Sequence, residues 1–168
     1  ALPILAAGAV HALVGENGAG KSTLIKILGG VHAPDSGRIL VNGRPVALQG
    51  PGAAMAAGIA VVAQEVRVAP NLSVAENVLL GHLPSRRRFG VLPMLDRTAL
   101  RTRAAEVLAR LNFAPDLDAP ARMLSYAERQ LLGIARSLSR EVQVLVLDEP
   151  TAALERREVG RLMETVRA

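Results

Sequence analysis

The sequence contains no cysteine, no tryptophan and few aromatic residues of any kind: one Tyr and two Phe among 168 residues. Without cysteine, neither a disulfide nor a thiolate metal site can form within this sequence. With so few rings to stack on bases, a nucleic-acid partner is not expected, although the formal net charge is +5. The core must be built instead from Ala, Val, Leu and Ile.

Long hydrophobic runs are also lacking. No stretch approaches the ~20 apolar residues that a membrane-spanning helix requires. The opening residues ALPILAAGAV are apolar but short, and they contain Pro3 without a preceding positive region, so they do not indicate a signal peptide. We therefore expect any membrane connection to come through a partner. Lysine is scarce as well, since only Lys21 and Lys26 occur among the 20 basic residues.

Apolar periodicity predicts strands near both ends of the chain and helices between them. The strands are predicted over 9–14, 59–63 and 144–147, with a hairpin at 38–46 turning on Asn42-Gly43. The helices are predicted over 22–28, 53–57, 74–80 (capped by Ser73), 97–111 (capped by Asp96) and 126–138. The segment 80–95 is predicted to be a loop because of its Gly and Pro residues. This order indicates an α/β core, residues 1–65 and 141–168, carrying an inserted helical subdomain over 66–140.

A phosphate-binding loop is predicted at residues 15–23, GENGAGKST, which match G-x-x-x-x-G-K-[ST]. Glycines let successive backbone N–H groups face one anion, and the following helix adds its positive N-terminus. Lys21 supplies a charge for the β- and γ-phosphates of ATP, and the Ser22 hydroxyl can ligate Mg²⁺. A chance glycine-rich turn is disfavoured, because the match lies between an apolar segment and a helix. The predicted nucleotide contacts are Gly15, Glu16, Asn17, Gly18, Ala19, Gly20, Lys21, Ser22 and Thr23.

Two acidic residues, Asp148 and Glu149, end the apolar run VLVL at 144–147. Asp148 is placed to hold Mg²⁺, and Glu149 to orient or deprotonate an attacking water. Acidic residues also begin ordinary turns after a strand. This pattern therefore indicates a magnesium site only in combination with the phosphate loop upstream.

Together, GENGAGKST, Gln64, LSYAERQ at 124–130 and VLVLDEP resemble the ABC ATPases. GENGAGKSTLIKILGG, NLSVAENVLLG at 71–81 and DEPTAAL at 148–154 look like the ATP-binding subunits of bacterial simple-sugar importers, the ribose, galactose and xylose group. The resemblance implies a P-loop NTPase fold that binds ATP and Mg²⁺ and hydrolyses ATP to drive carbohydrate import. Its implied partners are a second ABC ATPase domain and a separate membrane permease. Through that permease the protein would be peripheral at the cytoplasmic face of the inner (plasma) membrane.

The resemblance also assigns roles to single residues. Gln64 would contact Mg²⁺ and the attacking water. Ser125, Ala127 and Glu128 belong to the signature segment, which in this family reaches the γ-phosphate held by the opposite domain. In this sequence, Tyr126-Ala127 occupies the two positions where the family usually has glycine, and Glu128 occupies the position where it usually has glutamine. Ser125-x-x-Glu128 is equally a helix capping box, and both interpretations can hold together.

Two further departures lie at the flanks. No aromatic residue precedes the phosphate loop to stack on adenine, and no switch histidine follows the acids. The sequence thus resembles a subunit truncated at both ends, and we expect the 168 residues alone to bind nucleotide weakly and hydrolyse it negligibly. Two alternatives stay open: a nucleotide-binding domain that is hydrolytically inactive, and a soluble ABC ATPase that serves no transporter.

Overall fold

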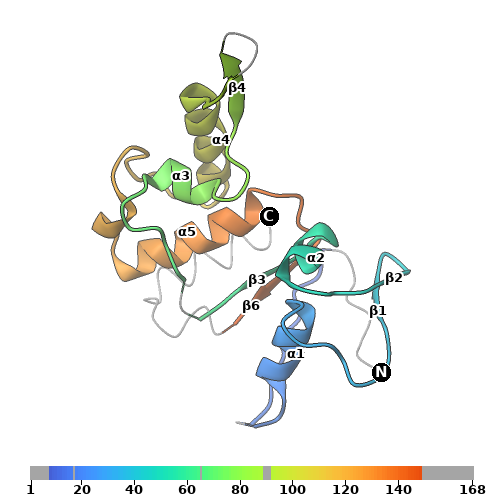
Figure 1. The fold of residues 1–168 in the computed structure, drawn as a ribbon. Helices are drawn as coiled ribbons and strands as arrows, with labels where there is room; N and C mark the ends of the chain where they lie inside the picture. The colour runs from blue at the N-terminus through green and yellow to red at the C-terminus, as the bar shows by residue number, and fades with distance from the viewer. Residues whose placement is uncertain (1–7, 17, 65, 89–91, 149–168) are drawn as a thin grey trace.

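The computed structural model describes residues 8–16, 18–64, 66–88 and 92–148 (Figure 1). Two parallel strands lie beside each other: β3 (Ile59–Val62) and β6 (Val144–Leu147). Their register runs from Ile59↔Val144 to Val62↔Leu147. The ladder extends past both ends, because Gln143 N–H donates to Gly58 O at 2.8 Å and Asp148 N–H donates to Val62 O at 3.0 Å. This parallel pair, with helices packed on it, is the predicted α/β arrangement.

Helix α1 (Lys21–Leu28) ends at Leu28, as predicted, and Gly29 is its C-cap. Gly30 has φ 71°, and its N–H donates to Ile27 O at 3.0 Å. The N–H of Val31 donates to Lys26 O at 2.8 Å, which completes a Schellman motif. A Cβ added at Gly30 would lie 2.3 Å from Gly50 O, so this turn also needs glycine for its close approach to the start of α2 (Pro51–Ala56).

The hairpin predicted from Asn42-Gly43 is present. Strands β1 (Ile39–Val41) and β2 (Arg44–Val46) pair antiparallel, with Val41 opposite Arg44. Both turn residues have positive φ, 51° at Asn42 and 74° at Gly43, as a two-residue type I′ turn requires. The Asn42 side chain donates to Gln143 Oε1 at 2.8 Å, which ties the turn to the residue before β6.

The helical region contains the main apolar core. It comprises α3 (Val74–Val78), α4 (Arg97–Arg110), the 3₁₀ turn η1 (Ala121–Met123) and α5 (Tyr126–Leu138). One face of α4 is buried, and it consists of Leu100, Ala104, Val107, Leu108 and, at the C-cap, Leu111. In Figure 1, α5 lies between the other helices and the strand pair. It contacts α3, α4 and β3, and thereby joins the helical region to the sheet.

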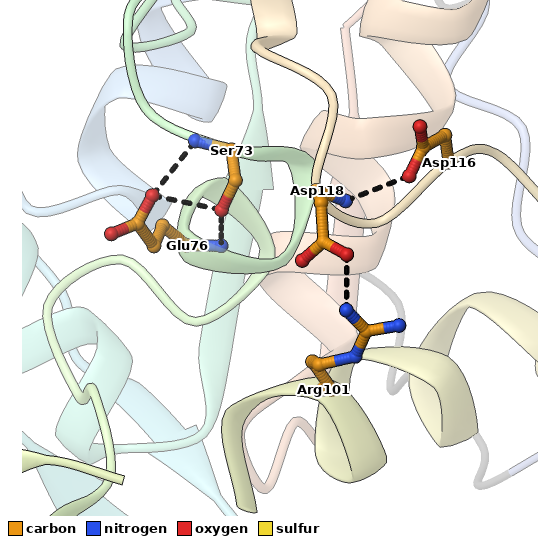
Figure 2. A network of polar contacts seen from close by, with 5 residues as sticks. All are labelled: Ser73, Glu76, Arg101, Asp116 and Asp118. Atoms are coloured by element: carbon orange, nitrogen blue, oxygen red, sulfur yellow. Dashed lines mark hydrogen bonds and ion pairs between the residues drawn. The ribbon is translucent and has the colours of Figure 1, made fainter. Parts of the chain in front are cut away.

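Polar caps fix the starts of these helices. Ser73 N–H donates to Glu76 Oε2 at 2.8 Å and Glu76 N–H donates to Ser73 Oγ at 3.2 Å, a capping box at α3 that Figure 2 shows. The bond from the Ser73 backbone lowers the pKa of Glu76, and the Ser73 hydroxyl adds to this effect. On the other side of Figure 2, Arg101 of α4 pairs with Asp118, whose N–H donates to Asp116 Oδ1 at 3.0 Å.

Two predictions were wrong. Residues 9–14 form no strand: they are irregular and exposed, Val14 to 88%. A strand needs a hydrogen-bonded neighbour, and among the described residues β3 pairs only with β6. The segment 80–95 is not a simple loop, because β4 (Ser85–Arg88) and β5 (Leu92–Leu95) pair antiparallel within it. Pro93 is tolerated since each strand of a two-stranded ribbon is an edge.

The rest of the predicted order is confirmed, including Ser73, Asp96 and Ser125 as helix N-caps. Residues 149–168, the last part of the predicted α/β core, lie outside the described residues. Within the part of the chain that the structure describes, no helix is both long and apolar enough to cross a membrane.

Candidate functional site

The loop before α1 curls around the ammonium group of Lys21. Gly18 and Gly20 have φ values of 87° and 88°, a region that other residues rarely adopt. Ala19 N–H donates to Glu16 O at 3.1 Å and closes a tight turn. Lys21 Nζ donates to Gly15 O at 2.7 Å and to Glu16 O at 3.0 Å. The side chain thus holds its positive charge against the loop, while Asn17 lies outside the described residues.

The start of α1 adds a second source of positive potential. Its N-cap is Gly20, which has no side chain to accept from the first-turn N–H groups. No acidic residue lies in that turn, and Ser22 and Thr23 are exposed there. The positive end of the helix therefore meets no protein carboxylate on its own first turn, an arrangement suited to an anionic ligand.

The carboxyl ends of β3 and β6 bring the candidate metal-site residues near each other. Val62 and Leu147 are register partners, and the next contact is from Asp148 N–H to Val62 O. Asp148 therefore leaves β6 beside the segment that leads from β3 to Gln64. Glu149, the predicted water-orienting acid, lies outside the described residues.

These strand ends and the loop belong to elements that pack on each other. Helix α1 contacts β3, and a Cβ added at Gly29 would lie 3.4 Å from Val61 Cγ2. In Figure 1 both strands run from the α2 end toward the lower part of the view, and the loop before α1 also lies in that lower part. The parallel order of β3 and β6 puts both strand ends at one edge of the sheet, the usual position for a ligand in α/β folds.

The donor set suits magnesium. Ser22 offers a hydroxyl oxygen, Asp148 a carboxylate and Gln64 an amide oxygen, and hard oxygen ligands are those that Mg²⁺ prefers. Among the described residues, no group of three or more His, Cys, Asp and Glu side chains could hold a metal alone.

At the predicted signature segment, the capping box is confirmed. Ser125 N–H donates to Glu128 Oε2 at 2.7 Å, and Glu128 N–H donates to Ser125 Oγ at 3.3 Å. The Glu128 carboxylate is thus bound to the backbone of its own helix start. Ser125 is exposed and Ala127 is half-buried, so this end of α5 is accessible to another molecule.

Sequence reasoning missed Gln130, which lies one turn along α5 and is only 6% exposed. Its Nε2 donates to the backbone oxygen of Gln64 at 2.7 Å and to Tyr126 Oη at 3.1 Å. The signal in the sequence was a polar residue on the apolar face of a helix, where the partner was not identifiable without the fold.

A second network, also missed, holds the chain just after Gln64. Asn77 is fully buried and its Nδ2 donates to Ala69 O at 3.0 Å. Arg136 of α5 donates through Nε to Asn77 O and through Nη1 to Arg67 O, both at 2.9 Å. Burial lowers the pKa of Arg136. Segment 67–69 is therefore fastened to α3 and α5 by side-chain bonds.

Comparison with known proteins agrees with this arrangement. A sequence model of the family described as "ABC transporter" matches residues 4–152. The chain is 52% identical over 160 residues to "Ribose import ATP-binding protein RbsA 2" of Streptomyces avermitilis, covering 95% of this chain and 31% of that protein. It is 50% identical over 161 residues to "Ribose import ATP-binding protein RbsA" of Rhodococcus jostii, with 96% and 31% covered. The chain thus spans about a third of the length of these relatives.

Solved structures give the same fold. The structure of cbiO1 from Clostridium perfringens, described as part of the ABC transporter complex cbiONQ, superposes with a TM-score of 0.75 at 32% identity, covering 96% of this chain and 62% of that chain. The ADP conformation of MJ1267, an ATP-binding cassette of an ABC transporter, gives a TM-score of 0.76 at 25% identity, with 96% and 65% covered.

Proposed function

This chain belongs to the ABC transporter family, and we propose that it binds Mg-ATP through residues 15–23 and, within a longer protein, hydrolyses ATP to drive sugar import. The observation that carries the proposal is the loop itself. Its two glycines at positive φ, the Lys21 ammonium and the uncapped start of α1 form a concentrated site for phosphate.

The chain's own residues divide the work. The loop amides and Lys21 hold the phosphates, and Ser22, Gln64 and Asp148 would hold Mg²⁺. When bound, Mg²⁺ offsets negative charge on the phosphate oxygens. Glu149 would accept a proton from, or orient, the attacking water. Phosphoryl transfer depends chiefly on such positioning and charge stabilisation, because the protein supplies little covalent chemistry.

The proposed partners are those expected of a member of this family. We propose that the exposed start of α5, with Ser125, Ala127 and Glu128, faces the γ-phosphate held by a second ABC ATPase domain. A separate membrane permease would carry the sugar, with this protein peripheral at the cytoplasmic face. The core would comprise 1–65 and 141–168, and the helical subdomain 66–140. The proteins similar to this chain are named for ribose import, which makes ribose the first substrate to test.

The test uses substitutions in the chromosomal gene, so that the whole protein is produced in the cell. We expect a chromosomal Lys21→Ala or Glu149→Gln substitution to abolish uptake of radiolabelled ribose, galactose or xylose, with the protein level unchanged. Lys26→Ala, which changes the other lysine of the sequence, is the matched control. Undiminished uptake of all three sugars in the Lys21→Ala strain would exclude sugar import as the function. Phosphate release by the purified protein, with Glu149→Gln as the blank, separates an ATPase from a domain that only binds.

A further inference from the structure

We propose that Tyr126 and Gln130 are positioning residues that clamp the backbone carbonyl of Gln64 and so set where the Gln64 side chain meets the magnesium-nucleotide. The inference rests on the proposed function, which places Gln64 beside Mg²⁺. It goes further by naming what holds Gln64 and by giving a role to Tyr126, which stands where the ABC family ordinarily has glycine.

The clamp consists of three polar groups from two distant segments. Gln130 Nε2 donates to Gln64 O at 2.7 Å and to Tyr126 Oη at 3.1 Å. Tyr126 Oη in turn donates to Gln64 O at 3.5 Å, a longer and weaker contact. Because Tyr126 and Gln130 are four residues apart on α5, both side chains lie on one face of the helix.

The two clamp residues differ in burial, and this difference sets how much each bond contributes. Gln130 is 6% exposed, so its amide has little access to water and depends on partners within the protein. Tyr126 is 49% exposed and covers the outer side. Removing the Gln130 amide therefore leaves the Gln64 carbonyl without its short bond, while removing the Tyr126 hydroxyl loses a weaker one.

The clamp connects two parts of the proposed site. On one side, Asp148 N–H holds Val62 O, which fixes the β3 end to the β6 end. On the other side, Gln130 holds Gln64, two residues further along. The first turn of α5 is itself set by the bonds between Ser125 and Glu128. A displacement of α5 would therefore move Gln64 relative to Asp148, so the clamp links the signature segment to the magnesium ligands.

The test measures how much Mg²⁺ strengthens nucleotide binding. A fluorescent N-methylanthraniloyl-ATP is titrated into the protein with Mg²⁺ and again with EDTA, and the ratio of the two dissociation constants is taken. We expect Gln130→Met, which keeps the side-chain size but lacks the donor, to reduce this ratio about 3- to 10-fold, the value of one hydrogen bond. Tyr126→Phe should reduce it about 2-fold, and affinity in EDTA should stay unchanged in both.

The matched control is Gln143→Met, the same exchange at an exposed glutamine that bonds Asn42 instead, and it should leave the ratio unchanged. If Gln130→Met fails to fold, Tyr126→Phe decides the matter, since its ring is retained. Should Lys21→Ala weaken binding while both clamp variants keep the full ratio, the clamp is refuted and the proposed function stands. Should Lys21→Ala bind as tightly as the unchanged protein, the proposed function fails and the clamp falls with it.

Discussion

Replacing Lys21 by Ala tests the phosphate loop, and the contacts of Lys21 allow the expected loss of Mg-ATP affinity to be worked out. Lys21 Nζ donates to Gly15 O and Glu16 O at 2.7 and 3.0 Å, so binding phosphate requires it to exchange these bonds. Two charge-assisted contacts to phosphate contribute about 3–6 kcal/mol, and two ordinary bonds given up cost about 1–3 kcal/mol. Taking the midpoints of these ranges, about 4.5 and about 2 kcal/mol, the net loss in the variant is about 2.5 kcal/mol, or roughly 70-fold in Kd for Mg-ATP.

The fold should tolerate this change. The two carbonyls that Lys21 contacts lie at the surface, where water replaces the lost donor, so the free energy of unfolding should fall by no more than the about 1–3 kcal/mol of those two bonds. Calorimetric titration with Mg-ATP gives the affinity, and circular dichroism with urea gives the stability. Lys26→Ala on the same helix serves as the control and should leave the Kd unchanged. A folded Lys21→Ala protein with unaltered affinity would refute the assignment of the loop.

Three further predictions concern the helices that carry the site. Ser125→Ala removes the cap of α5 and should lower the free energy of unfolding by about 0.5–2 kcal/mol in urea titrations; an unchanged midpoint would mean that the capping box contributes nothing. The folded-state pKa of Glu76 is lowered, so the stability that this carboxylate contributes is complete above the unfolded value of 4.5 and is lost as pH falls through the lower folded value. Glu76→Gln should flatten this part of the curve of unfolding free energy against pH. A curve identical to that of the unchanged protein would contradict the prediction. Leu132 is fully buried, so Leu132→Ala should cost about 2–5 kcal/mol, whereas the exposed control Leu83→Ala should cost much less.

The features that the sequence predicted correctly depend on local chemistry. Asn42-Gly43 determines its turn through its own backbone preference, and Ser73 and Ser125 cap helices through bonds only three residues long. The phosphate loop, which stays a prediction, is likewise contained within nine residues. These signals need no knowledge of the fold.

The features that were missed depend on strand pairing and on packing rather than on the conformational preference of single residues. Residues 9–14 carry the apolar run of a strand, but no strand among the described residues pairs with them. The β4–β5 ribbon depends on cross-strand pairing, such as Arg87 with Pro93, that glycine and proline content conceals. Gln130 and its acceptor on Gln64 are 66 residues apart in the sequence, so only the packing of α5 on β3 reveals that they meet.

In the proposed function, the start of α1 and the end of β6 together hold one magnesium-nucleotide. A double-mutant cycle of Ser22→Ala and Asp148→Asn, read by calorimetry as the ratio of ATP affinity with Mg²⁺ to that in EDTA, tests it most directly. If both side chains serve the same ion, each single change removes most of the Mg²⁺-dependent gain and the double variant loses little more, because the effects are coupled. Two results would contradict this: the free-energy losses of the two single variants add up in the double variant, or the double variant keeps the Mg²⁺-dependent gain in ATP affinity.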